Sequence, residues 1–244
     1  MIKCNILGVD INVTNMRETI NLIEQNLRNI KGNYICVSNV HTTVMAYDNE
    51  EYREIQNGGF MALPDGKPLS IICKRRGFKE AERVTGPDLM GEIFKISEKT
   101  GYTHYFYGST QEILDELKVK LNKNYPHLKI VGMYSPPFIK LTVNEDKNII
   151  KIINESNVDF VWVGLGAPKQ EIWMYEHRDK VSSLMIGVGA GFEYYAEKIK
   201  RAPIILQKLS LEWVYRLLQD PKRLYKRYLS TNFKFIFLIF RCHG

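Results

Sequence analysis

The chain has 244 residues, a length that suits one large domain or one domain with an appendage. Hydrophobic residues make up 45% of the sequence and charged residues 25%, fractions that are ordinary for a globular protein and argue against bulk disorder. The net charge is +7, and basic residues gather toward the C-terminus. The expected partners therefore carry negative charge: nucleic acid, an anionic membrane or a phosphorylated substrate.

The cysteines are scattered, with no CxxC pair and no metal-ligand spacing, at Cys4, Cys36, Cys73 and Cys242. Together with an N-terminus that does not resemble a signal peptide, this pattern predicts a reducing cytoplasm. The best candidate for a membrane segment, Phe233–Phe240, is far shorter than the roughly 20 apolar residues that span a bilayer. It is long enough to lie in a membrane interface.

From the N-terminus to Pro203, short apolar runs that end in turn residues alternate with helical patterns such as Met16–Ile30 and Gln111–Leu121. We predict strands at Ile35–Val37, Phe60–Leu63, Thr103–Tyr107, Lys129–Gly132, Asp159–Gly164 and Leu184–Val188. Capping-box spacing marks two helix starts, at Ser109 with Glu112 and at Thr142 with Glu145. Such alternation indicates an α/β fold, with a Rossmann-like, mostly parallel sheet flanked by helices.

After Pro203 the strand patterns stop, and Leu206–Leu218 and Lys222–Leu229 have helical patterns. We therefore expect an α/β core at residues 1–203 and a basic, aromatic, helical appendage at residues 204–244. No internal repeat or low-complexity linker interrupts the chain.

Two junctions between a strand and a turn are rich in glycine. The first, Gly164–Glu171, has a proline at the expected first helical position, so Lys169 and Gln170 would lie in the first turn beside a bound anion. The second, Gly187–Gly191, misses the GxGxxG spacing because Phe192 stands where the third glycine belongs. Backbone N–H groups at such junctions face phosphates in α/β folds, so the pair predicts a nucleotide or sugar-phosphate site.

A carboxylate, Asp65, lies between a strand and a Gly-Lys-Pro turn. One interpretation is turn chemistry, since Asp-Gly is a common turn pair. The other is a general base at the carboxyl edge of the sheet, where such folds bind their ligands. Asn39 and Thr42 follow another strand and would point to the same edge, where they could bind a sugar hydroxyl. Between them, His41 is either catalytic or a residue of a helix start.

The C-terminal arginines Arg216, Arg223 and Arg227 share one face of a helix if that helix continues through Pro221. They form either a solvated basic face or a set of cations for a departing diphosphate. The second role would be needed because the chain has no Asp-x-Asp motif to hold a metal ion. A membrane-surface element is favoured by the Phe-rich end and by the interleaved Trp213, Tyr215, Tyr225 and Tyr228.

Several segments together resemble the bacterial WecG/TagA/CpsF glycosyltransferases: SNVHTTVM, ALPDGKPL, RVTGPDL, GLGAPKQEIW, GVGAGFE, RAP and LEWVYRLLQDPKRLYKRY. Each is weak alone, but the ordered set is specific and covers nearly the whole chain. The resemblance implies an inverting, metal-independent transfer, without a cofactor, of an N-acetylmannosamine-type hexose from a UDP-sugar to a polyprenyl-diphosphate-linked N-acetylglucosamine. Such an enzyme would serve cell-surface polysaccharide or teichoic acid synthesis and would dock its appendage on the anionic inner face of the cell membrane.

The resemblance also implies roles for single residues. Asp65 matches the family's catalytic base, and Gln170 matches a polar residue near the donor. The expected catalytic set is Asp65, Gln170, Asn39 and Thr42. The expected set for the donor and its diphosphate is Gly66, Arg83, Gly164, Gly166, Lys169, Gly187, Gly189, Glu193, Arg216, Arg223 and Arg227. No metal-binding residues are expected.

Three departures from the family pattern leave the donor hexose open. Val37 stands where TagA-type members carry a threonine, Glu193 where an aspartate is common, and Glu197 where a glycine is common. Two other classes of protein are the alternatives. A NAD(P)-dependent oxidoreductase is disfavoured by the broken glycine spacing, and a basic nucleic-acid or membrane-binding module explains the tail but not Asp65. We expect no nucleic-acid partner; self-association that masks the appendage stays open.

Overall fold

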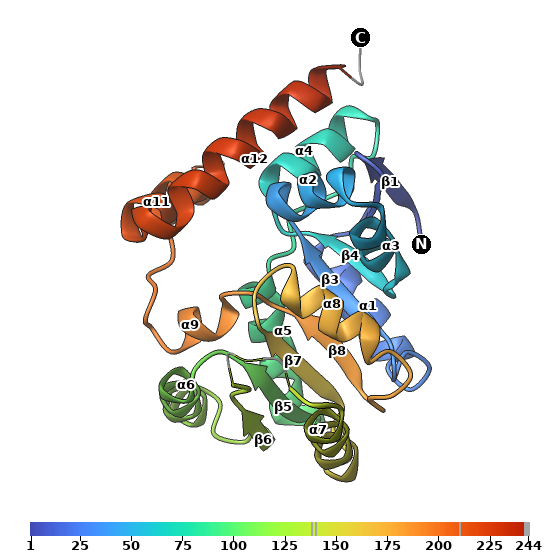
Figure 1. Cartoon of the computed structure of the whole chain (residues 1–244), viewed down its shortest axis with the longest axis vertical. Helices are drawn as coiled ribbons and strands as arrows, with labels where there is room; N and C mark the ends of the chain where they lie inside the picture. Colours follow the sequence, from blue (N-terminus) through green and yellow to red (C-terminus); the bar gives the residue numbers. More distant parts are fainter. Residues whose placement is uncertain (138, 140, 210, 242–244) are drawn as a thin grey trace.

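The computed structural model describes residues 1–137, 139, 141–209 and 211–241 and shows an α/β fold, as the sequence predicts (Figure 1). Within these residues, six parallel strands form the central sheet in the order β4-β3-β8-β7-β5-β6. Their bounds are β3 Tyr34–Ser38, β4 Met61–Pro64, β5 Thr103–Gly108, β6 Lys129–Tyr134, β7 Phe160–Gly164 and β8 Leu184–Gly187. Each predicted strand overlaps one of them.

Helices connect the strands and cover both faces of the sheet (Figure 1). Those of the first two thirds of the chain are α1 Met16–Asn26, α2 Val40–Asp48, α3 Glu50–Gly58, α4 Lys67–Arg75, α5 Gly86–Thr100, α6 Gln111–Asn124 and α7 Val143–Glu155. The remainder are α8 Lys169–Glu176, α9 Gly191–Tyr195, α10 Ile204–Lys208, α11 Glu212–Gln219 and α12 Pro221–Arg241.

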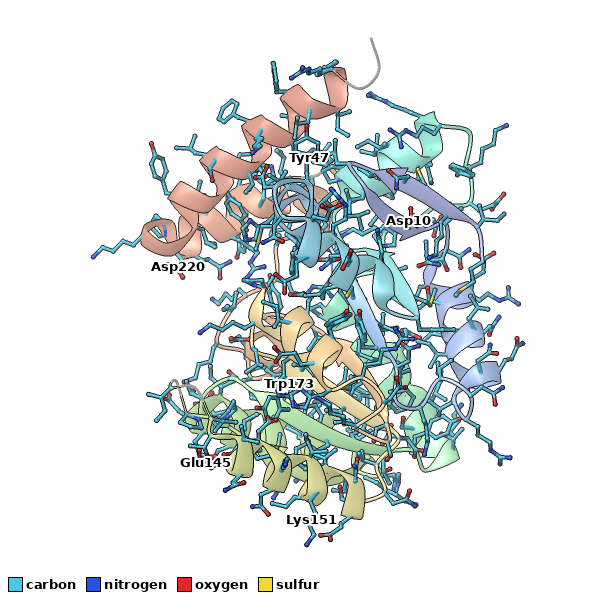
Figure 2. All side chains as sticks on the ribbon, turned by 45° about the vertical axis from the view of Figure 1, so that its right-hand side comes forward. Asp10, Tyr47, Glu145, Lys151, Trp173 and Asp220 are labelled. Carbon is cyan, nitrogen blue, oxygen red and sulfur yellow. The ribbon has the colours of Figure 1, made fainter. Side chains whose placement is uncertain are left out.

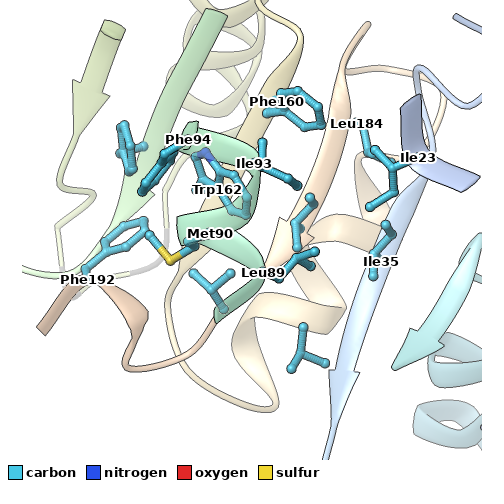
Figure 3. Close-up of a cluster of buried hydrophobic side chains, with 14 of the residues drawn as sticks. Ile23, Ile35, Leu89, Met90, Ile93, Phe94, Phe160, Trp162, Leu184 and Phe192 are labelled. Carbon is cyan, nitrogen blue, oxygen red and sulfur yellow. The ribbon is translucent and has the colours of Figure 1, made fainter. Parts of the chain in front are cut away.

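The alternation of side chains along each strand divides the core between the two faces of the sheet. In β3, Ile35 and Val37 join a cluster with α1, α5 and α6, whereas Tyr34 and Cys36 join a cluster with α7 and α8. Figure 3 shows the first cluster, in which Phe94 of α5 meets Trp162 of β7 edge to face. On the other face, Trp173 of α8 lies inside the molecule, while Glu145 and Lys151 of α7 lie at its surface (Figure 2).

A separate antiparallel hairpin, β1 Lys3–Ile6 and β2 Val9–Asn12, was not predicted. Its strands are very short, and the turn between them uses Leu7 and Gly8 with positive φ angles of 51° and 90°. The hairpin contributes Ile6, Val9 and Ile11 to a third core cluster, which also contains residues of α2, α3 and α4.

One of the two expected capping boxes is confirmed and the other is wrong. At α7, Thr142 Oγ1 accepts from the backbone N–H of Glu145, and Glu145 Oε2 accepts from that of Thr142. At α6 the capping residue is Thr110 rather than Ser109, and its Oγ1 accepts from the N–H of Ile113 at 3.4 Å. Ser109 has a φ of 61°, so it belongs to the turn before the cap.

The C-terminal helices do not form one continuous helix. Asp220 has φ −140° and ψ 69°, so α11 ends before it and α12 begins at Pro221. The ring of a proline clashes with the preceding residue when that residue is helical, which explains the break at Asp220. The prediction that Arg216 shares one helical face with Arg223 and Arg227 required a helix that continues through Pro221, so it is wrong.

The long helix α12 lies along α2 (Figure 1) and has two apolar faces. Leu224, Phe235 and Leu238 are buried, and the latter two belong to the cluster of the hairpin and α2. The outer face carries the exposed side chains Phe233, Phe237 and Phe240. Among the described residues, no helix is both long and apolar enough to cross a bilayer.

Candidate active site

A cavity of about 1380 Å³ lies at the carboxyl ends of the parallel strands. Its wall includes residues that follow β3, β4, β5, β7 and β8, together with residues of α11 and α12. Open α/β sheets bind their ligands at this edge. The volume exceeds the roughly 300–1,000 Å³ of most small-molecule sites, so the cavity has room for more than one ligand.

The cavity brings together most of the residues that the sequence singled out. Its wall contains Asn39, Thr42, Asp65, Gly66, Arg83, Gly164, Gly166, Lys169, Gln170, Gly187, Gly189, Glu193 and Arg216. The side chains of Arg223 and Arg227 lie outside the part of the chain that the structure describes. Among the described residues, no group of three or more His, Cys, Asp or Glu side chains is arranged to hold a metal ion.

Asp65 lies directly after β4, and its backbone N–H donates to the carbonyl of Ser38 at the end of β3 at 2.8 Å. Burial raises the pKa of its carboxyl group to about 6, whereas the nearby Arg83 and Arg216 oppose this rise and Glu212 adds to it. A carboxyl group with this pKa is mostly ionised at neutral pH and is a stronger base than an exposed aspartate. The site therefore contains a carboxylate suited to accept a proton.

Arg83 connects this loop to the C-terminal helices. Its Nε donates to the backbone carbonyl of Asp65 at 2.7 Å, and its Nη2 donates to Glu212 Oε2 of α11 at 2.5 Å. The ion pair is largely shielded, with Arg83 20% and Glu212 17% exposed. One turn further along α11, the guanidinium of Arg216 lies over the ring of Tyr194, 5.5 Å from its centre. The charged groups that act on Asp65 are therefore two cations, Arg83 and Arg216, and two carboxylates, Glu212 and Asp88.

Asn39 and Thr42 are engaged with each other at the start of α2. Asn39 Oδ1 accepts from the backbone N–H groups of His41 and Thr42, and Thr42 Oγ1 accepts from the N–H of Asn39 at 2.9 Å. This reciprocal arrangement is a capping box, so His41 is a residue of the helix start that also lines the cavity. Any contact of Asn39 with a sugar would use its carboxamide nitrogen.

The glycine turns differ from the expectation that their amides face a phosphate. The N–H groups of Gly166 and Gly189 both donate to Gln170 Oε1, at 3.2 and 3.0 Å. These hydrogen bonds join the two turns through Gln170. The side chain is only 4% exposed, so it does not project freely into the cavity. The proline of the first turn, Pro168, also differs, because it is the residue before α8 rather than its first residue.

The remaining glycines of these junctions allow close approach. A Cβ atom on Gly187 would lie 2.8 Å from Met174 Cε and 3.0 Å from Gln170 Nε2. A Cβ on Gly164 would lie 2.7 Å from the ring of Phe192. Glycine at these positions lets the strand ends pack against α8 and α9.

Some cavity residues had no role in the sequence interpretation: Arg201, Tyr194 and Glu212. Arg201 donates through both terminal nitrogens to Asp88, at 2.5 and 2.9 Å, and so fixes the segment before α10 to the start of α5. Arg201 lies in the RAP segment, and Glu212 lies in the long C-terminal motif. Those motifs indicated that the two segments matter for function, but they did not indicate which of their residues line the cavity.

Nearly the whole chain is similar to known proteins. Residues 4–243 match the model of the Glycosyl transferase WecG/TagA/CpsF family. The chain is similar to the N-acetylglucosaminyldiphosphoundecaprenol N-acetyl-beta-D-mannosaminyltransferase of Staphylococcus aureus strain MW2, with 32% identity over 225 residues that cover 91% of this chain and 87% of the relative. The proteins of the same name from strains NCTC 8325 / PS 47 and MRSA252 show the same identity and coverage.

Proposed function

Because the chain belongs to the WecG/TagA/CpsF family of glycosyl transferases, we propose that it transfers an N-acetylmannosamine-type hexose from a UDP-sugar to a polyprenyl-diphosphate-linked N-acetylglucosamine. The product would enter a cell-surface polysaccharide or teichoic acid. The names of the similar staphylococcal proteins support this acceptor and this sugar. A cavity with room for two ligands is consistent with a reaction that joins a donor to an acceptor.

The observation that carries the proposal is Asp65, a half-buried carboxylate at the strand edge with a pKa raised to about 6. In the proposed step, this carboxylate takes the proton of the acceptor hydroxyl while the hydroxyl oxygen attacks the anomeric carbon of the donor. The bond between that carbon and the diphosphate oxygen breaks on the opposite side, so the configuration inverts and UDP departs. Asp65 needs to lie about 3 Å from the hydroxyl oxygen.

Cationic side chains would stabilise the charge that grows on the departing UDP. Arg83 and Arg216 flank Asp65, and Lys169 lies in the wall at the start of α8. Arg223 and Arg227 remain candidates for the same role. Arginine suits it because its planar guanidinium pairs with two phosphate oxygens at once. Preorganised donors of this kind are worth roughly 3 kcal/mol each in transition-state stabilisation, so we propose that no metal ion is needed.

The C-terminal helices would bring the lipid-linked acceptor to the base. Tyr228, Phe235 and Ile236 of α12 line the cavity, while Phe233 and Phe237 of the same helix are exposed. We propose that residues 204–244 act as an appendage to the core and rest on the anionic inner face of the cell membrane. The aromatic outer face would enter the interface, and basic residues would face lipid headgroups.

The test is UDP release from UDP-N-acetylmannosamine with a lipid-diphosphate-N-acetylglucosamine acceptor, measured in EDTA for the wild type, Asp65→Ala and Asp65→Asn. We expect acceptor-dependent release that persists in EDTA and falls about 10²- to 10⁴-fold in both variants. The matched control is Asp115→Asn, an exposed carboxylate on α6 that should leave the rate unchanged.

Release from a different UDP-sugar would retain the mechanism and change the donor. If no UDP-sugar gives release with acceptor and vesicles present, the proposed function is wrong. Full activity in Asp65→Ala would refute only the role of Asp65 as the base and would leave the proposed transfer standing.

A further inference from the structure

The first turn of α8 carries two buried polar side chains side by side, Gln170 and Glu171, which are 4% and 0% exposed. Gln170 Oε1 accepts the amides of Gly166 and Gly189, which belong to the turns after β7 and after β8. A single oxygen atom therefore joins the two glycine turns that line the cavity. Its position depends on the orientation of one carboxamide group.

That orientation is supported by Glu171. Its Oε1 accepts a hydrogen bond from Gln170 Nε2 at 2.8 Å. If the carboxamide rotated by half a turn, its N–H₂ group would face the N–H groups of both glycines, and its oxygen would face a carboxyl oxygen. Glu171 and the two glycine N–H groups therefore favour the same rotamer, in which Gln170 accepts from both turns.

Stability does not explain a carboxyl group at this position. Burial raises the pKa of Glu171, and its hydrogen bond with Gln170 opposes this rise. Burying a carboxyl group costs free energy, and a pair of apolar side chains in place of Gln170 and Glu171 would fill the same space at a lower cost. The position therefore gains something other than packing from an oxygen acceptor.

The network continues behind Glu171 to the neighbouring strand. The hydroxyl of Tyr52 lies beside the Glu171 carboxyl and accepts from Gln56 Nε2 at 3.0 Å. Gln56 Oε1 in turn accepts from Ser38 Oγ at 2.6 Å. Ser38 ends β3, and its carbonyl accepts the amide of Asp65. Buried polar groups therefore link the carboxyl ends of β3, β7 and β8 to the loop of Asp65.

We infer that Glu171 is a positioning residue, which orients Gln170 so that the turns of Gly166 and Gly189 are held at the spacing that donor binding needs. The inference rests on the proposed function and on the prediction from the sequence that the donor lies against these two turns. It also changes the expected role of Gln170, which would shape the donor site through its oxygen rather than contact the reacting atoms.

The experiment compares Glu171→Gln and Glu171→Leu in the full-length protein. Glu171→Leu keeps the volume but removes the acceptor of Gln170 Nε2, so the carboxamide is held less firmly and its hydrogen bonds with the two turns weaken. We expect the donor KM to rise about tenfold, as for the loss of about 1.4 kcal/mol, with a smaller change in kcat. Glu171→Gln retains an oxygen acceptor and should recover most of this loss.

A core variant separates positioning from general destabilisation. Ile153→Ala removes a buried side chain of α7 that is absent from the cavity wall, so it should lower the melting temperature and leave the donor KM unchanged. If Glu171→Leu behaves like Ile153→Ala, with a lower melting temperature and an unchanged KM, the inference is wrong.

A second readout needs no substrate. Amide hydrogen exchange, followed by NMR, reports whether the N–H groups of Gly166 and Gly189 remain protected. In Glu171→Leu both should exchange about tenfold faster, whereas Glu171→Gln and Ile153→Ala should show no such selective change. Unchanged exchange in Glu171→Leu would overturn the inference even in an active enzyme. A wild type that releases no UDP would refute the proposed function, and the exchange data would still decide the role of Glu171.

Discussion

The two sides of the cavity are held in place by different interactions. The floor, formed by the turns of Gly166 and Gly189 with Gln170 and Glu171, depends on buried hydrogen bonds. The roof, formed by α11 and α12, joins the core through ion pairs and apolar contacts, such as Arg83 with Glu212 and Lys234 with Asp48. Buried hydrogen bonds keep their geometry with or without substrate, whereas partly exposed ion pairs are open to competition and to salt.

This difference suggests that the two sides of the cavity have different roles, one toward the donor and the other toward the membrane-bound acceptor. A donor diphosphate would compete with Glu212 for the guanidinium of Arg83, so binding would loosen one attachment of the roof. The exposed aromatic face of α12 would supply another attachment at the membrane. The floor would then determine which donor fits, and the roof would determine where the reaction takes place.

The largest effect should come from removal of the roof. A chain that ends at Pro203 loses Arg216 and the apolar contacts of Phe235 and Leu238. We expect acceptor-dependent UDP release on vesicles to fall by more than about 10²-fold, because at least one cation for the departing diphosphate is lost with the membrane attachment. Calorimetric binding of UDP should weaken less, since the floor remains. A truncated chain with full activity would contradict these roles of floor and roof.

Arg83→Ala tests the link between floor and roof with a single side chain. We expect kcat to fall about 10²-fold, which corresponds to roughly 3 kcal/mol, because the guanidinium contacts the Asp65 loop and, in the proposed function, would also pair with the departing diphosphate. Arg83→Lys should restore part of the rate, since it keeps the charge without the fork of donors. The control is Arg53→Ala, whose partner is the exposed Glu50. A lysine variant as active as the wild type would argue against a geometric role of the guanidinium.

The outer face of α12 should have a smaller effect that is specific to membranes. Phe237→Ser and Phe240→Ser each remove an aromatic side chain that is exposed in the free protein, at 63% and 74%. We expect vesicle binding to weaken about tenfold for each, because burial of a phenylalanine is worth about 1.5–3 kcal/mol. Activity on a short-chain soluble acceptor should not change. The matched control, Val119→Ser, removes an exposed apolar side chain on α6, at the opposite end of the molecule (Figure 1).

In both the floor and the roof, the sequence could predict the features that depend on local pattern and on topology. Short apolar runs that end in turn residues located every strand of the central sheet, and parallel strands bring their carboxyl ends to one edge, so Asp65 and the glycine turns could be placed together in advance. These inferences depend only on local pattern and topology. They are therefore most reliable where the chain is most regular.

Pairings between distant side chains could not be predicted in the same way. Glu212 is far from Arg83 in the sequence, and nothing local to either residue indicates the other. Gln170 was identified by its motif, but its partners, Gly166 and Gly189, follow from the packing of β7 against β8. The hairpin was missed because polar residues interrupt its two strands, KCNI and VDIN, so neither forms the continuous apolar run that marked the strands of the central sheet. The break at Asp220, in contrast, was foreshadowed by Pro221.

The smallest effect concerns the pH dependence of the base, and its sign is the informative part. The raised pKa of Asp65 predicts that kcat/KM increases with pH through about 6, as the carboxyl group loses its proton and becomes a base. The groups that act on it are Arg83 and Arg216, which lower the pKa, and Glu212 and Asp88, which raise it. Glu212→Gln removes a negative charge and releases Arg83 from its carboxylate partner. Both changes favour the ionised form of Asp65, so the acidic limb should move to lower pH.

At pH 5 the ratio of kcat/KM to its plateau value should therefore rise roughly threefold in Glu212→Gln, as for a shift of about half a pH unit. Arg216→Gln should move the limb in the opposite direction, because it removes a cation that favours ionised Asp65. The measurement is the pH profile of kcat/KM under saturating vesicle concentrations, with each variant normalised to its own plateau. A limb that stays in place in both variants would mean that the roof does not act on the charge of Asp65. Shifts of opposite sign would show that α11 influences the base electrostatically, beyond its part in closing the cavity.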